Sequence, residues 1–136
     1  MKGKGEIPFF DTNVLVYLLS ADRRKADRAE SLVASGGTIS VQVLNEMAHV
    51  MRRKTGMGWG AVRDVLAALR AVLSVVPMDQ DMHNLGIDLA ERHGFSVWDA
   101  MIVAAAQRSG ASVLWSEDMD GGLTLPGGPA IRNPFA

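Results

Sequence analysis

In the stretch Ile7-Pro-Phe-Phe-Asp-Thr-Asn13, a short apolar run ends abruptly at polar residues. This pattern predicts a buried strand over residues 7–10, with Asp11 at its carboxyl end. Similar short apolar runs recur along the chain and predict further strands. They lie at residues 38–41, at 74–77, at 111–115 and near Ile131.

The segments between these runs carry apolar residues at helical spacing. In residues 42–54, for example, Val43, Met47 and Val50 fall on one face. Helices are expected over residues 14–19, 22–34, 42–54, 59–73, 79–93 and 96–108. Short strands that alternate with helices predict an α/β fold, in which helices flank a mostly parallel central sheet.

Composition narrows the class of protein. The 136 residues, 48% hydrophobic and 21% charged, suit one globular domain over residues 1–136, without repeats or linkers. The absence of cysteine excludes disulfide scaffolds, thiolate zinc sites and cysteine nucleophiles. The net charge of -1 argues against a protein that coats DNA irrespective of sequence. No apolar run is long enough to span a membrane, and we expect a soluble cytoplasmic protein.

Two acidic residues follow predicted strands. Asp11 follows the first strand, and Asp118 follows the strand that ends at Trp115. In open parallel sheets, ligands bind outside the carboxyl ends of the strands, so both acids are candidates for a site. Each also has a structural interpretation, because Asp11 suits a helix N-cap and Asp118 lies in a polar turn with Glu117 and Asp120.

Two more acids lie on predicted helices. Glu46 lies at the edge of an apolar stripe, where it either points into solvent or borders a cleft. Asp99 shares a helix face with Ile102 and Ala106, and a carboxylate there is costly to bury unless it is paired or bound to metal. Alternatively, Ser96 and Asp99 form a capping box at the start of this helix.

A parallel sheet would bring all four acids to one rim. Clustered carboxylates repel one another, and a hard divalent cation removes that repulsion. Because the candidate ligands are all oxygens, they favour Mg²⁺ or Mn²⁺ over zinc.

Four segments resemble the PIN-domain family. They occur in the family's order and are Phe9-Phe-Asp-Thr-Asn-Val-Leu15, Ser40-Val-Gln-Val-Leu-Asn-Glu46, Phe95-Ser-Val-Trp-Asp-Ala-Met-Ile-Val-Ala-Ala-Ala106 and Leu114-Trp-Ser-Glu-Asp118. The layout is similar to VapC-type toxins of bacterial toxin–antitoxin pairs. The resemblance implies a three-layer α/β sandwich and an endoribonuclease that needs Mg²⁺ or Mn²⁺.

The resemblance also implies site residues and partners. Asp11, Asp99 and Asp118 would hold one or two ions, Glu46 would bind metal or orient water, and Asp120 is a further candidate ligand. RNA cleavage by metal-activated water would leave a 5′-phosphate and a 3′-hydroxyl. The expected partners are an antitoxin and a second copy of the chain, with DNA contacted only through the antitoxin. Other possibilities are a PIN nuclease of RNA processing and a non-catalytic module on the same scaffold.

Other residues are open to two interpretations. Thr12, Asn13 and Ser116 either orient carboxylates and water or form local caps and turns. Asn13 also argues against a phosphatase of the haloacid dehalogenase type, which has a second Asp at that position. The basic run Arg52-Arg-Lys54 suits a helix C-terminus better than an RNA contact. The three histidines, His49, His83 and His93, do not have the spacing of metal ligands and are interpreted as surface or packing residues. The three tryptophans are interpreted as core residues rather than as base-stacking platforms, and they are Trp59, Trp98 and Trp115.

Overall fold

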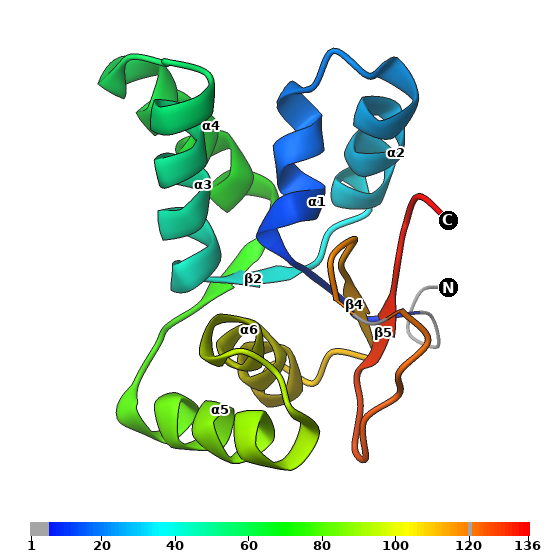
Figure 1. The fold of residues 1–136 in the computed structure, drawn as a ribbon. Coiled ribbons are helices and arrows are strands. Elements are labelled where there is room, and N and C mark those ends of the chain that lie inside the picture. Colours follow the sequence, from blue (N-terminus) through cyan, green and yellow to red (C-terminus); the bar gives the residue numbers. More distant parts are fainter. Residues whose placement is uncertain (1–5, 120) are drawn as a thin grey trace.

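The computed structural model of the chain describes residues 6–119 and 121–136 (Figure 1). In these ranges a five-stranded sheet has the order β3-β2-β1-β4-β5, and every neighbouring pair of strands is parallel. The strands are β1 Pro8–Phe10, β2 Thr38–Ser40, β3 Ser74–Val76, β4 Val113–Trp115 and β5 Ala130–Arg132. The predicted α/β fold with a mostly parallel sheet is therefore confirmed.

Helices cover both faces of the sheet and make a three-layer sandwich (Figure 1). One layer holds α1 to α4, and the opposite layer holds α5 and α6. Their bounds are α1 Thr12–Val16, the 3₁₀ helix η2 Tyr17–Leu19, α2 Arg23–Ala34, α3 Val41–Lys54, α4 Trp59–Val72, α5 Gln80–His93 and α6 Val97–Arg108. In this described part of the chain, no helix has the length and apolar character needed to cross a membrane.

The junction between β2 and α3 differs from the prediction. Val41 was expected to end a strand, but it is the first residue of α3. The reason is local, because the buried hydroxyl of Ser40 accepts a hydrogen bond from the Val43 amide at 3.4 Å and caps the helix. The strand thus passes into the helix that carries Glu46 without an intervening loop.

Helix α6 lies at the centre of the molecule. Its residues from Ala100 to Ala106 are all buried, which explains why this segment is alanine-rich and has little polar surface. It packs closely against α5, where a Cβ added at Gly86 would come within 2.5 Å of the Met101 sulfur. The glycine at position 86 therefore allows α5 and α6 to pack closely.

The tryptophans divide into two kinds. Trp115 on β4 is 8% exposed, as expected for a core residue. The prediction that Trp59 and Trp98 belong to the core is wrong, because they are 59% and 69% exposed. Both lie in the first turn of a helix. Trp59 is covered in part by the guanidinium of Arg52, at 4.4 Å from the ring centre.

Candidate active site

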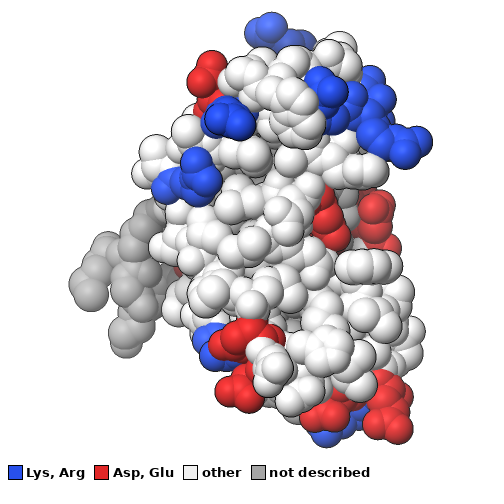
Figure 2. Space-filling view, turned by 90° about the vertical axis from the view of Figure 1, so that its left-hand side faces the viewer, with Lys and Arg blue, Asp and Glu red and all other residues white. Residues whose placement is uncertain are grey.

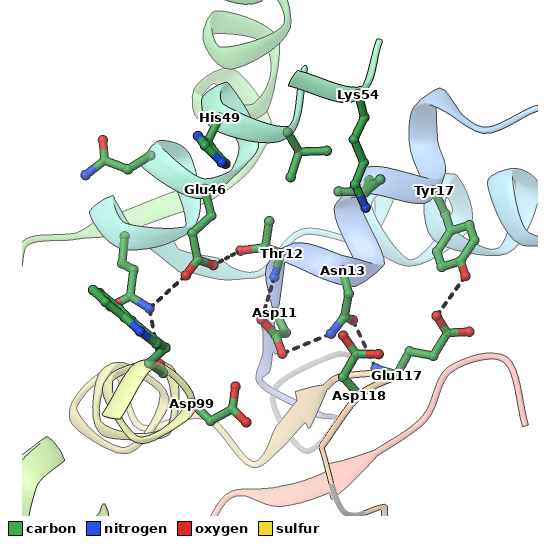
Figure 3. A pocket seen from close by; sticks show the side chains of 15 residues that line it. Asp11, Thr12, Asn13, Tyr17, Glu46, His49, Lys54, Asp99, Glu117 and Asp118 are labelled. Carbon is green, nitrogen blue, oxygen red and sulfur yellow. Dashed lines mark hydrogen bonds between the residues drawn. The ribbon is translucent and has the colours of Figure 1, made fainter. Parts of the chain in front are cut away.

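Four acidic side chains from four different elements line one pocket of about 640 Å³ (Figure 3). Asp11 follows β1, Glu46 lies on α3, Asp99 lies in the first turn of α6, and Asp118 follows β4. Strands β1 and β4 are adjacent and parallel, so their carboxyl ends, with Asp11 and Asp118, meet at the same edge. The structure thus brings together the four acids that the sequence singled out.

Asp11 is held by a dense set of hydrogen bonds. Its Oδ1 accepts from the Thr12 amide at 2.7 Å, which caps α1. Its Oδ2 accepts from the Ser116 hydroxyl at 2.8 Å and from the Asn13 side-chain amide at 3.1 Å. Its backbone amide donates to the Trp115 carbonyl at 3.0 Å and extends the pairing of β1 with β4. The capping role and a place in the pocket therefore coexist in one residue.

Burial makes the ionised form of Asp11 unfavourable. The residue is 6% exposed, and burial raises its pKa from 3.8 to about 6. The charges of Asp99 and Glu46 also raise the pKa, while the hydrogen bonds from Ser116 and Thr12 lower it. A cation in the pocket would favour the ionised carboxylate.

The side chain of Glu46 is half-buried and lines the pocket, so it is not freely solvated. One of its carboxylate oxygens accepts a short hydrogen bond from the Thr12 hydroxyl. The other accepts from the Gln42 side chain, one helical turn earlier, at 3.1 Å. These two donors fix the orientation of the carboxylate and leave it further lone pairs for a ligand.

Asp99 faces the same pocket from the opposite layer. Burial raises the pKa of its carboxyl, as do the nearby charges of Asp118 and Glu46, against a smaller lowering by the Ser96 side chain. Ser96 also caps α6, because its hydroxyl accepts from the Asp99 amide at 3.1 Å. Asp118 itself is exposed at the rim.

Ser116 and Asn13 connect the loop after β4 to the start of α1. The buried Ser116 hydroxyl donates to Asp11 and accepts from the Met119 amide at 3.2 Å. The Asn13 side-chain oxygen accepts from the Glu117 amide at 3.0 Å. Both of the interpretations proposed from the sequence describe real contacts, because these side chains form local turns and also contact the carboxylate of Asp11.

The two neighbouring acids of the β4 loop point in different directions (Figure 3). Glu117 points toward Tyr17, whose hydroxyl donates to it at 2.7 Å, and it also pairs with Lys25 at 2.7 Å. These contacts lower the pKa of the Glu117 carboxyl. Asp118 instead lines the pocket at its rim, where its charge raises the pKa of Asp99. Asp120, the third acid of this turn, lies outside the described residues.

The donor set suits a hard divalent cation. Over residues 6–119 and 121–136, no three acidic or histidine side chains lie close enough together to enclose an ion as they stand. The four carboxylates nevertheless share one pocket, and two of them have raised pKa values because of burial and mutual repulsion. Oxygen-only ligands match the preferences of Mg²⁺ and Mn²⁺, so the chemistry of the pocket fits such an ion.

Several pocket residues were not expected from the sequence. Helix α3 lines one wall at intervals of three or four residues, which is the spacing of one helix face. The pocket-lining residues not predicted as part of the site are Val16, Tyr17, Gln42, Asn45, His49, Val50, Lys54 and Trp98. The spacing from Glu46 could have indicated Gln42, His49 and Lys54, but it could not show that this face borders a cavity.

Comparison with known proteins identifies the family. The family model of the PIN domain matches residues 9–121. No sequence of a curated protein matches the chain. Among solved structures, a toxin–antitoxin complex from Klebsiella pneumoniae is 21% identical, with a TM-score of 0.71 over 93% of this chain and 97% of that one.

Two further solved structures have similar folds. VapC20 from Mycobacterium tuberculosis, described as a toxin that cleaves the sarcin–ricin loop, is 25% identical, with a TM-score of 0.68 over 83% of this chain and 91% of its own. DNA-bound VapBC from Salmonella typhimurium is 18% identical, with a TM-score of 0.70 over 95% of this chain and 98% of that one. With a family model that spans most of its length and a fold shared with these proteins, this chain belongs to the PIN domain family.

Proposed function

We propose that this protein is a divalent-metal-dependent endoribonuclease and the toxin component of a type II toxin–antitoxin pair. The observation that carries the proposal is the convergence of Asp11, Glu46, Asp99 and Asp118 on one pocket of a PIN fold. Membership of this family and the likeness to VapC-type structures support a nuclease.

The four acids would have different tasks. Asp11, Asp99 and Asp118 would hold one or two Mg²⁺ or Mn²⁺ ions, with Asp120 as a further candidate ligand. Glu46 would bind metal or orient the attacking water, since Thr12 and Gln42 already hold its carboxylate in one orientation. Thr12, Asn13 and Ser116 would keep the carboxylates in place through the hydrogen bonds described above.

The reaction is hydrolysis of an RNA phosphodiester. When bound, the metal would neutralise the scissile phosphate and make water a better nucleophile at neutral pH. The water oxygen forms a bond to phosphorus, the bond from phosphorus to the 3′ oxygen breaks, and a proton passes to that oxygen. The products are a 5′-phosphate and a 3′-hydroxyl.

Partners follow from the toxin assignment. The structure from Klebsiella pneumoniae is described as a toxin–antitoxin complex, and the one from Salmonella typhimurium as DNA-bound VapBC. We propose a cognate antitoxin as the inhibitor of this protein, a homodimer as its assembly and the cytoplasm as its place of action. In this scheme the antitoxin, and not this chain, contacts DNA.

The test is cleavage of a mixed RNA pool by the purified, antitoxin-free protein with Mn²⁺ and with EDTA. We expect cleavage only with Mn²⁺, and Asp99→Asn should abolish it while circular dichroism shows an intact fold. Asp88→Asn is the matched control, because Asp88 is exposed on α5 and does not line the pocket. Full activity of the Asp99→Asn protein would refute the site. Failure of Mn²⁺ to bind to the wild-type protein in a titration would refute the metal dependence.

A further inference from the structure

We propose that Trp98 is a stacking platform for an unpaired base of the substrate strand, beside the carboxylates. This inference deepens the nuclease proposed above and rests on it. In this role the exposed indole of Trp98 supplies a contribution to RNA binding that does not depend on charged side chains.

The position of Trp98 suits such a role. It precedes Asp99 in the first turn of α6 and lines the same pocket, yet it is 69% exposed. Its indole therefore offers a large apolar surface directly beside the carboxylates. An incoming base would bury its ring face, and base–aromatic stacking is tolerant of sequence because every base has a π-face.

The backbone beneath the indole is held in place. The Trp98 carbonyl accepts a hydrogen bond from the side-chain amide of Gln42 at 3.2 Å. Gln42 is itself buried, and the same amide nitrogen donates to Glu46 at 3.1 Å. The Gln42 side chain therefore links the backbone of Trp98 to the carboxylate of Glu46. A base stacked on Trp98 would thus be held at a fixed position relative to the acids. A platform held in this way reduces the ordering cost of binding.

Electrostatics give a reason why stacking is needed. Among the described residues that line the pocket there are five acids but a single lysine, Lys54, and no arginine. Figure 2 shows the side of the molecule that bears α4 and α5, where most basic side chains gather toward the upper end, acidic and basic ones mix toward the lower end, and acidic ones lie at mid-height on the right. That face presents no continuous basic track for an RNA backbone. Because the pocket itself offers a single lysine to phosphates, contacts that do not depend on phosphate charge would add to affinity there.

A protein partner is the competing occupant of this side chain. Val97, which precedes Trp98, is 47% exposed, and adjacent exposed apolar residues occur at protein interfaces. The observation that favours RNA is that Trp98 shares the pocket with the acids and with polar side chains such as Asn45, which can bond to base edges.

The experiment compares two fluorescent ten-nucleotide probes, an oligoadenylate and a strand of abasic ribose phosphates, by anisotropy with Ca²⁺ in place of Mn²⁺. The wild-type protein should bind the oligoadenylate ~5- to 150-fold more tightly than the abasic strand, the range expected for one stacked base. Trp98→Ala should remove this preference, and Trp98→Phe should retain part of it. Trp98→Ala should leave the salt dependence of binding unchanged, because no phosphate contact is lost.

Trp59→Ala is the matched control, because Trp59 is also exposed in the first turn of a helix but lies outside the pocket lining. An unchanged preference in Trp98→Ala, from a wild-type protein that cleaves the RNA pool, would overturn the stacking role alone. A wild-type protein that neither binds the probes nor cleaves the pool would overturn the nuclease and the stacking role together. Unchanged RNA affinity with a lower mass in light scattering for Trp98→Ala would assign the residue to a protein interface.

Discussion

Replacing Asp11 by asparagine should make the metal-free protein more stable above neutral pH and less stable in acid. The carboxyl is 6% exposed, and its pKa rises from 3.8 to about 6 on folding, chiefly because of burial. Since the folded-state pKa is the higher one, the folded protein binds more protons than the unfolded chain between about pH 4 and pH 6. The wild-type protein therefore loses stability as the pH rises through that window.

The size of the effect follows from the same pKa values. The rise from 3.8 to about 6 corresponds to about 3 kcal/mol of lost stability once the pH lies well above both values. Asparagine carries no charge, so the Asp11→Asn protein escapes this loss. However, the side-chain nitrogen of the new asparagine cannot accept the hydrogen bonds that Ser116 and Asn13 donate to Asp11 Oδ2. Losing these bonds costs about 1–2 kcal/mol of stability. The variant should thus be less stable than wild type by about 1–2 kcal/mol near pH 4 and more stable by about 1–2 kcal/mol near pH 8.

The assay is urea unfolding of both proteins in EDTA, with free energies compared at matched pH from about 4 to 8. In thermal scans near pH 8, the variant should melt higher by ~3 to 8 °C. Adding Mn²⁺ should stabilise the wild-type protein and do much less for the variant, because the ion binds only to the folded site. A stability difference that stays constant across this pH range would refute the argument that burial of the Asp11 charge opposes folding.

Three further predictions concern particular side chains. Asp118→Asn should abolish cleavage of the RNA pool, whereas Glu117→Gln should retain most of it because Glu117 is engaged away from the pocket centre; equal losses would contradict this division. Thr12→Val keeps the shape but removes a donor to the Glu46 carboxylate, and should lower kcat ~5- to 30-fold with an unchanged melting temperature. Gly37→Ala would place a Cβ 2.6 Å from the Phe10 ring, so urea unfolding should show a free energy of unfolding lower by about 1–3 kcal/mol. An unchanged midpoint would mean that β1 can shift freely.

Local patterns in the sequence were sufficient for the elements of the fold. The apolar runs before Asp11 and Asp118 became the adjacent strands β1 and β4, and the periodic segment around Glu46 became α3. These patterns are informative because strand and helix periodicity depends on neighbouring residues alone. The errors at element ends, such as Val41, also have local causes, since a single capping hydroxyl moves the boundary by one residue.

Local sequence patterns were also sufficient to select the candidate acids, but they could not predict which side chains surround each acid. The sequence left Glu46 open to a solvated interpretation and Asp99 open to a purely capping one. The structure gives Glu46 a donor from α1 and gives Asp99 both a helix cap and a place on the pocket wall. Each outcome depends on which face of one element meets another, and periodicity within an element does not contain that information.

The α/β class, the order of the elements and the acids near their ends could thus be predicted from local sequence patterns. How those acids and their partners meet depends on the packing of distant elements. Ser116 contacts Asp11 across 105 positions of the chain, and Lys25 holds Glu117 across 92. The tertiary structure also left Trp98 exposed beside Asp99, where the apolar character of the residue had predicted burial. The physical reason is that the period and capping of an element are set by residues a few positions apart, while a pocket forms where elements far apart in sequence pack together.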